Sequence, residues 1–116
     1  MSMPEPTSPA QTCLVFTAVP DETLADLLAH QLVEAGLAAC VKRLPACQST
    51  YRWAGRIEHA TEIPLIIVVH DEAYAALEQH LKSAHPYDVP EILAIDCSAG
   101  LPDYLRWVAD VSRAPA

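Results

Sequence analysis

The chain has 116 residues, of which 52% are hydrophobic, and a formal net charge of −8. This length fits one domain that can bury a core. The acidic balance, with only 7 Lys and Arg, argues against nucleic acid or an anionic membrane as the main partner, since both bind clustered cations. No apolar run approaches the roughly 20 residues that a membrane-spanning helix needs.

The cysteines indicate a reducing compartment. None belongs to a C-x-x-C pair, and each lies in apolar or strand-like sequence; they are Cys13, Cys40, Cys47 and Cys97. Thiols of this kind act as small core residues where disulfides are rare. Residues 1–11 also lack the basic and apolar segments of a signal peptide, so we expect a cytoplasmic protein.

The first part of the chain predicts a tail, a strand and a helix. Residues 1–11 hold prolines among polar side chains, which indicates a disordered or extended tail before a single domain at residues 12–113. Residues 13–17 form an apolar run typical of a strand buried on both faces. Asp21 is a good helix N-cap, and Gly36 ends that helix. The apolar stripe of the helix is Leu24, Leu27, Leu28, Leu32 and Ala35.

The middle of the chain predicts a hairpin. Residues 37–41 form a second strand, which Pro45 interrupts. Residues 48–53 continue in extended form, and the dipeptide Ala54-Gly55 is a turn signal.

The longest strand follows the hairpin turn. It is expected at residues 61–70, of which residues 65–69 are apolar without alternation. Pro64, just before this apolar run, indicates an edge or a bulge because proline cannot donate to a ladder. Asp71 with Glu72 caps a second helix, which ends at His85-Pro86. Its apolar stripe is Leu77, Leu81 and Ala84, with Ala73 or Tyr74.

The last segments are a strand at residues 92–97 and a short closing helix that begins at Pro102. The order is then β-α-β-β-α-β with an added helix. This order predicts the α+β class and a ferredoxin-like split β-α-β arrangement, in which an antiparallel sheet carries both main helices on one face. Residues 14–16 and 65–69 are nevertheless apolar on both faces, so the second face of the sheet must be buried elsewhere. Self-association is the simplest remedy.

Residues 85–92 (HPYDVPEI) concentrate polar groups in a stiff loop between two prolines. His85, Asp88 and Glu91 are candidate metal ligands, because imidazole with carboxylates suits Cu²⁺, Zn²⁺ or Ni²⁺. Binding through His85 would weaken as the imidazole protonates below about pH 6.5. Alternatively, His85 contributes only a favourable charge at the end of a helix, and the loop only turns a corner.

Five short motifs stand in order along the chain: residues 17–22 (TAVPDE), 36–41 (GLAACV), 51–58 (YRWAGRIE), 85–91 (HPYDVPE) and 103–107 (DYLRW). In this order and spacing they resemble the CutA family, the divalent-cation tolerance proteins, across nearly the whole chain. The resemblance implies a homotrimer whose sheets pack against each other and whose long middle hairpins reach neighbouring subunits. It also implies a role in the response to metal ions.

A second group of residues predicts a ligand cleft. Tyr51, Trp53 and Tyr87 could form its aromatic walls, and Arg52 and Arg56 could hold an anion such as a carboxylate or a phosphate. The same aromatic side chains could instead join subunits, and the two arginines could form surface ion pairs.

These observations support one main hypothesis about function and several alternatives. The main one is a non-enzymatic, cytoplasmic, homotrimeric protein of divalent-cation tolerance that binds copper or zinc and has no tightly bound cofactor. The alternative resembles the trimeric nitrogen-regulatory signal proteins, with an anionic metabolite in a cleft between subunits. A small enzyme that uses His85 as a general acid or base is a further alternative, although no nucleophile or cofactor motif accompanies it. A stable scaffold with an incidental cleft would have no ligand.

Overall fold

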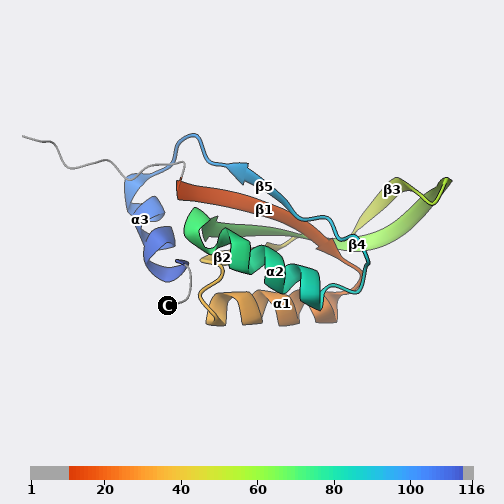
Figure 1. Ribbon diagram of the computed structural model, residues 1–116, viewed down its shortest axis with the longest axis horizontal. Helices are drawn as coiled ribbons and strands as arrows, with labels where there is room; N and C mark the ends of the chain where they lie inside the picture. Colours follow the sequence, from red (N-terminus) through yellow and green to blue (C-terminus); the bar gives the residue numbers. More distant parts are fainter. Residues whose placement is uncertain (1–10, 114–116) are drawn as a thin grey trace, which may run out of the picture.

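The computed structural model describes residues 11–113, and the predicted tail lies almost entirely outside them. The chain folds into one five-stranded antiparallel sheet with three α-helices (Figure 1). The elements are β1 (Thr12–Val19), α1 (Glu22–Glu34), β2 (Cys40–Arg43), β3 (Cys47–Trp53), β4 (Arg56–His70), the 3₁₀ turn η2 (Asp71–Ala73), α2 (Tyr74–Ala84), β5 (Leu93–Asp96) and α3 (Pro102–Val111). The predicted fold class and order of elements are confirmed.

The pairing of β1 with β4 forms the centre of the sheet. Eight residue pairs join the two strands, from Thr12 opposite His70 to Val19 opposite Ile63. β2 pairs with the other edge of β4, and β5 pairs with the other edge of β1, so the strand order is β2-β4-β1-β5. This is the ferredoxin-like order, and it brings the loops on either side of β5 next to β1.

Helices α1 and α2 cover the same face of the sheet (Figure 1). Their buried side chains, Leu28 and Leu32 from α1 and Leu77 and Leu81 from α2, pack on the side chains of β1 and β4 that point to this face. The predicted stripes are right in the main but too wide. Leu27 is exposed on α1, because the apolar face of a helix needs only about three or four positions in two turns.

The β3–β4 hairpin extends beyond the rest of the sheet (Figure 1). Ala54 and Gly55 both have positive φ, 51° and 78°, as the two-residue turn that matches strand twist requires. β4 then runs without a break through Pro64. The carbonyl of Pro64 accepts a hydrogen bond from the Leu44 backbone N–H. Both backbone groups of a strand residue point to the same side. The N–H that proline lacks would therefore point toward the gap between β2 and β3.

The start of the second helix differs from the prediction. The chain first makes the 3₁₀ turn η2, and its cap is the buried His70, whose ring Nδ1 accepts a hydrogen bond from the Glu72 backbone N–H. The His70 backbone N–H in turn donates to the Ser112 hydroxyl. A histidine that ends a strand can therefore replace Asp71 as the cap, because an imidazole nitrogen accepts as well as a carboxylate does.

The face of the sheet opposite α1 and α2 is largely bare. Cross-strand pairing places two apolar rows on it: Ile66, Phe16 and Leu93 in one, and Val68, Leu14 and Ile95 in the other. Helix α3 covers only one end of the second row, where Val108 packs on Val68. Leu93 and Ile95 remain 59% and 55% exposed. We call these two rows the outer sheet face.

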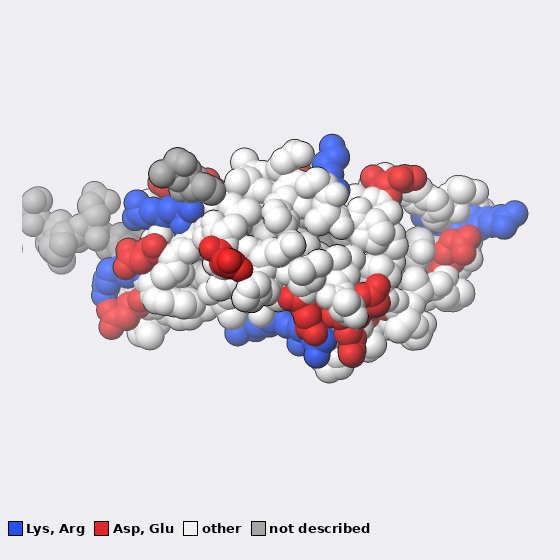
Figure 2. All heavy atoms as spheres, turned by 90° about the horizontal axis from the view of Figure 1, so that it is seen from below, with Lys and Arg blue, Asp and Glu red and all other residues white. Residues whose placement is uncertain are grey.

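Charged side chains on the helical face of the molecule lie mainly toward its margins, and its centre is largely uncharged (Figure 2). Lys and Arg form small groups among Asp and Glu there, and no continuous basic patch is visible on this face of the described residues (Figure 2). None of the helices within residues 11–113 combines the length and the apolar character that crossing a bilayer requires.

Cys13 gives the fold a predicted weakness at alkaline pH. Burial, helped by the negative charges of Asp71 and Asp96, raises the pKa of this thiol from 9.0 to about 11. The unfolded chain therefore releases the proton first, so the stabilising contribution is present below pH 9 and is lost as the pH rises to about 11. We expect at most about 3 kcal/mol of unfolding free energy to depend on this group. Denaturant unfolding between pH 8 and pH 11 should show a shallower decline for Cys13→Ala than for the unchanged chain, and an equal decline would contradict the assignment.

Candidate functional site

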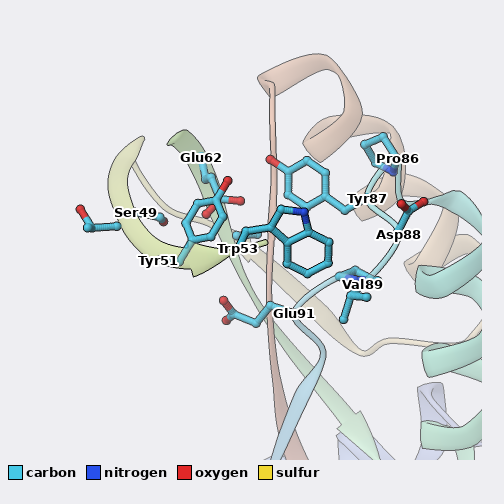
Figure 3. Close-up of a pocket in the computed structure, with 12 residues that line it drawn as sticks. Ser49, Tyr51, Trp53, Glu62, Pro86, Tyr87, Asp88, Val89 and Glu91 are labelled. Carbon is cyan, nitrogen blue, oxygen red and sulfur yellow. The ribbon is translucent and has the colours of Figure 1, made fainter. Parts of the chain in front are cut away.

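A cavity of about 790 Å³ lies where the base of the β3–β4 hairpin meets the loop after α2 (Figure 3). The loop between α2 and β5 contributes one wall, and the strands β3 and β4 contribute the other. The lining residues are Ala18, Ser49, Thr50, Tyr51, Trp53, Glu62, Pro86, Tyr87, Asp88, Val89, Pro90 and Glu91. Residues 86–91, most of the loop singled out in the sequence, thus line a concavity.

His85 holds this loop against the sheet. It ends α2 in an extended conformation, as expected for the residue before a proline, and its side chain is buried. Its ring Nδ1 accepts a hydrogen bond from the Tyr87 backbone N–H at 3.1 Å. Nε2 therefore carries the proton and donates to the Ala18 carbonyl at 2.7 Å. The imidazole clamps the loop to β1.

This clamp changes the interpretation of the predicted metal ligands. Both ring nitrogens of His85 are occupied by backbone groups, so neither has a lone pair to offer a metal ion. Asp88 and Glu91 line the cavity, but among residues 11–113 no group of three His, Cys, Asp or Glu side chains is placed to hold a metal ion. The set His85, Asp88 and Glu91 does not form a metal centre within one chain. Because His85 is not a ligand, the expected weakening of metal binding below about pH 6.5 has no basis either.

The predicted ligand cleft is found in part. Tyr51, Trp53 and Tyr87 line the cavity, whereas Arg52 and Arg56 do not. Arg52 stands opposite Ile57 on the other side of the ladder from Tyr51 and Trp53, because successive strand residues point to opposite faces. Arg56 lies across from Trp53 at the turn, on the same face of the ladder, but it does not line the cavity.

Glu62 is the charged lining residue that sequence reasoning did not identify as a site residue. Its side chain is only 9% exposed, and among the described residues no Lys, Arg or His forms an ion pair with it. It lies opposite Cys47 in the hairpin ladder, on the same face as Ser49, Tyr51 and Trp53. Counting alternate positions back from the turn would have placed it on this face, once the register of the hairpin was known.

Tyr87 is coupled to Glu62. Burial first, then the negative charge of Glu62 and a hydrogen bond to it, raise the pKa of the Tyr87 phenol above its usual value of 10.0. The phenol keeps its proton across the neutral range and lies close to the negative charge of Glu62.

The lining as a whole is acidic and aromatic. It contains the carboxylates of Glu62, Asp88 and Glu91 and no Lys or Arg. An anion in this cavity would face three negative groups without a compensating charge. The geometry of the single chain therefore disfavours the predicted anionic ligand and favours a cation.

Comparison with known proteins gives the relationship of the chain. Residues 13–111 match the family model described as CutA1 divalent ion tolerance protein. The chain belongs to the CutA1 family. It is 41% identical over 95 residues to the divalent-cation tolerance protein CutA of Pectobacterium atrosepticum, covering 82% of this chain and 86% of that protein.

More distant CutA proteins share the same domain. The protein CutA homolog of Xenopus laevis is 38% identical over 96 residues, which are 83% of this chain but only 64% of that longer protein. The crystal structure of CutA from Xylella fastidiosa superposes with a TM-score of 0.85 at 40% identity, over 88% of this chain and 98% of that one. The family assignment from the five motifs is confirmed.

The clamp predicts that His85 matters chiefly for stability. His85→Ala should leave the Ala18 carbonyl and the Tyr87 N–H without partners and create a cavity, at a cost of about 2–4 kcal/mol in unfolding free energy. His30→Ala is the matched control, because His30 is exposed and pairs only with Glu34; it should cost less than about 0.5 kcal/mol. Urea unfolding measures both. Equal effects of the two substitutions would show that the clamp contributes little.

Proposed function

We propose that this CutA1 chain is a non-enzymatic homotrimer of the cytoplasm that serves in divalent-cation tolerance and binds divalent metal ions, copper among them. The observation that supports assembly is the outer sheet face. Two apolar rows lie on it, in which Leu93 and Ile95 are exposed, and the aromatic rings of Tyr104 and Trp107 on α3 are exposed as well. Soluble monomers rarely expose contiguous apolar surface of this kind.

A closed ring is the assembly that this face favours. Each copy can place its outer sheet face against the next, and closure of the ring covers all the faces without leaving one bare. The family resemblance specifies three copies. The extended β3–β4 hairpin then has a neighbour within reach, which accounts for a strand pair that projects beyond its own core (Figure 1).

The oligomer is tested by sedimentation equilibrium at micromolar concentration. We expect a mass of three chains of 12.6 kDa each. Ile95→Lys should lower that mass, because a charge on the outer sheet face would be buried without a partner. Leu27→Lys is the matched control, since Leu27 is equally apolar and exposed but lies on α1, and it should leave the mass unchanged. A single-chain mass for the unchanged protein would refute the trimer.

The cavity carboxylates support the binding of cations. Asp88 and Glu91 present oxygen donors on a loop that His85 holds rigid, and Glu62 adds a third carboxylate from the opposite wall. Among divalent first-row metals, a given site of this kind holds Cu²⁺ most tightly. In this proposal His85 is a positioning residue and not a ligand, and any further ligand comes from water or from a second copy.

Calorimetric titration of chelator-stripped protein with Cu²⁺ and Zn²⁺ tests this proposal. Glu91→Gln and Asp88→Asn should each weaken binding about tenfold or more, because each removes a charged oxygen donor. Asp110→Asn, which removes an exposed carboxylate of α3, should leave the affinity unchanged. Binding that is insensitive to both cavity substitutions would place the metal elsewhere, and an absence of binding would refute metal binding by this protein.

A further inference from the structure

The cavity contains more than a metal ion would use. A hydrated or chelated metal needs oxygen, nitrogen or sulfur donors, yet three aromatic rings also line this space. One of them, the Trp53 indole, is 51% exposed. Figure 3 shows the rings of Tyr51, Trp53 and Tyr87 together around the same space as the carboxylates of Glu62 and Glu91. Aromatic faces and carboxylates attract the same kind of group, a positive charge, by different means.

An organic ammonium group satisfies both kinds of wall. The faces of Trp and Tyr attract a cation that has few water molecules to lose, and Trp does so most strongly. A carboxylate that is largely buried, such as Glu62, gains from a cation that can reach it without water between them. A neutral apolar ligand would leave Glu62 without compensation, and an anion would be repelled by all three carboxylates.

The volume of the cavity indicates that the ligand also has an apolar carbon skeleton. About 790 Å³ lies within the range of roughly 300–1,000 Å³ typical of small-molecule sites. It is far larger than an ammonium group alone. Val89, Pro86 and Pro90 supply apolar wall for the remainder of such a molecule.

We propose that the cavity between the β3–β4 hairpin and the loop after α2 is a binding site for an organic ammonium ion, a primary or quaternary amine with an apolar body. The charged head lies against Trp53 and Tyr51 with Glu62 as its counter-ion, and the Tyr87 ring completes the aromatic wall. The proposal goes beyond metal tolerance, because the indole ring of Trp53 is not a ligand for a metal ion. All the residues that it requires come from one chain.

Two pairs of probes test the proposal on the full-length protein in buffer that contains a chelator. Choline is compared with its neutral isostere 3,3-dimethylbutanol, and 2-phenylethylamine with 2-phenylethanol. Each cation and its neutral counterpart have nearly the same shape, so the comparison isolates the charge. Saturation-transfer NMR and calorimetry should show saturable binding of at least one cation, at least tenfold tighter than that of its neutral counterpart.

Substitutions then locate the site. Trp53→Leu and Glu62→Gln should each weaken the bound cation about tenfold, whereas Trp53→Phe, which keeps an aromatic face, should weaken it less than Trp53→Leu does. Asp110→Asn removes the same charge as Glu62→Gln at a distant place and should have no effect. The sedimentation mass and thermal unfolding of each variant confirm that it is folded and assembled as the unchanged protein is.

Three results would overturn the proposal. They are an absence of binding by both cations, equal affinity for a cation and its neutral counterpart, and equal losses for Glu62→Gln and Asp110→Asn. Because chelator is present throughout, failure here leaves the metal titration untouched. Conversely, Trp53→Leu should not alter Cu²⁺ affinity, so the two proposals fail separately.

Discussion

The pairing of β1 with β4 is the constraint on which the rest of the structure depends. It sets the register from Thr12 opposite His70 to Val19 opposite Ile63, and a shift of one strand by one residue would turn the side chains of that strand to the opposite face. In the observed register, one face of the pair receives α1 and α2, and the other becomes the outer sheet face. The same register fixes Ala18 beside the base of the hairpin, where the clamp from His85 ends.

Two segments that are distant in sequence form the site, the β3–β4 hairpin and the loop after α2, and each is fixed to the central pair β1–β4. β4 runs from the hairpin into the core as one strand, so Glu62 and the aromatic residues of β3 are positioned relative to the core. The loop after α2 is positioned from the other side, because His85 donates to β1. The cavity therefore has two walls that the backbone fixes, and the positions of its aromatic and acidic side chains follow from the positions of these walls.

Much of this fold could be predicted from sequence, because the strongest signals are local. Long apolar runs, Asp21 as a cap and Gly36 as a terminator, and the turn at Ala54-Gly55 all act through their neighbours in sequence. The site could be predicted only in part. His85 was noticed for its chemistry, but whether its ring nitrogens face a ligand or the backbone depends on where Ala18 lies. That position depends on the tertiary fold, because Ala18 and His85 are 67 residues apart in the sequence.

The errors at the hairpin have the same origin. Arg52 stands next to Trp53 in sequence, and nearness in sequence suggested a shared cleft. In a strand, neighbours point to opposite faces, so Arg52 is separated from the cavity while Glu62, distant in sequence, is brought into it through the ladder. The exchange of an arginine for a glutamate reverses the sign of the site. A cleft expected to hold an anion becomes one whose charge and aromatic faces both favour a cation, and the acidic cavity is then consistent with a family named for its tolerance of positive ions.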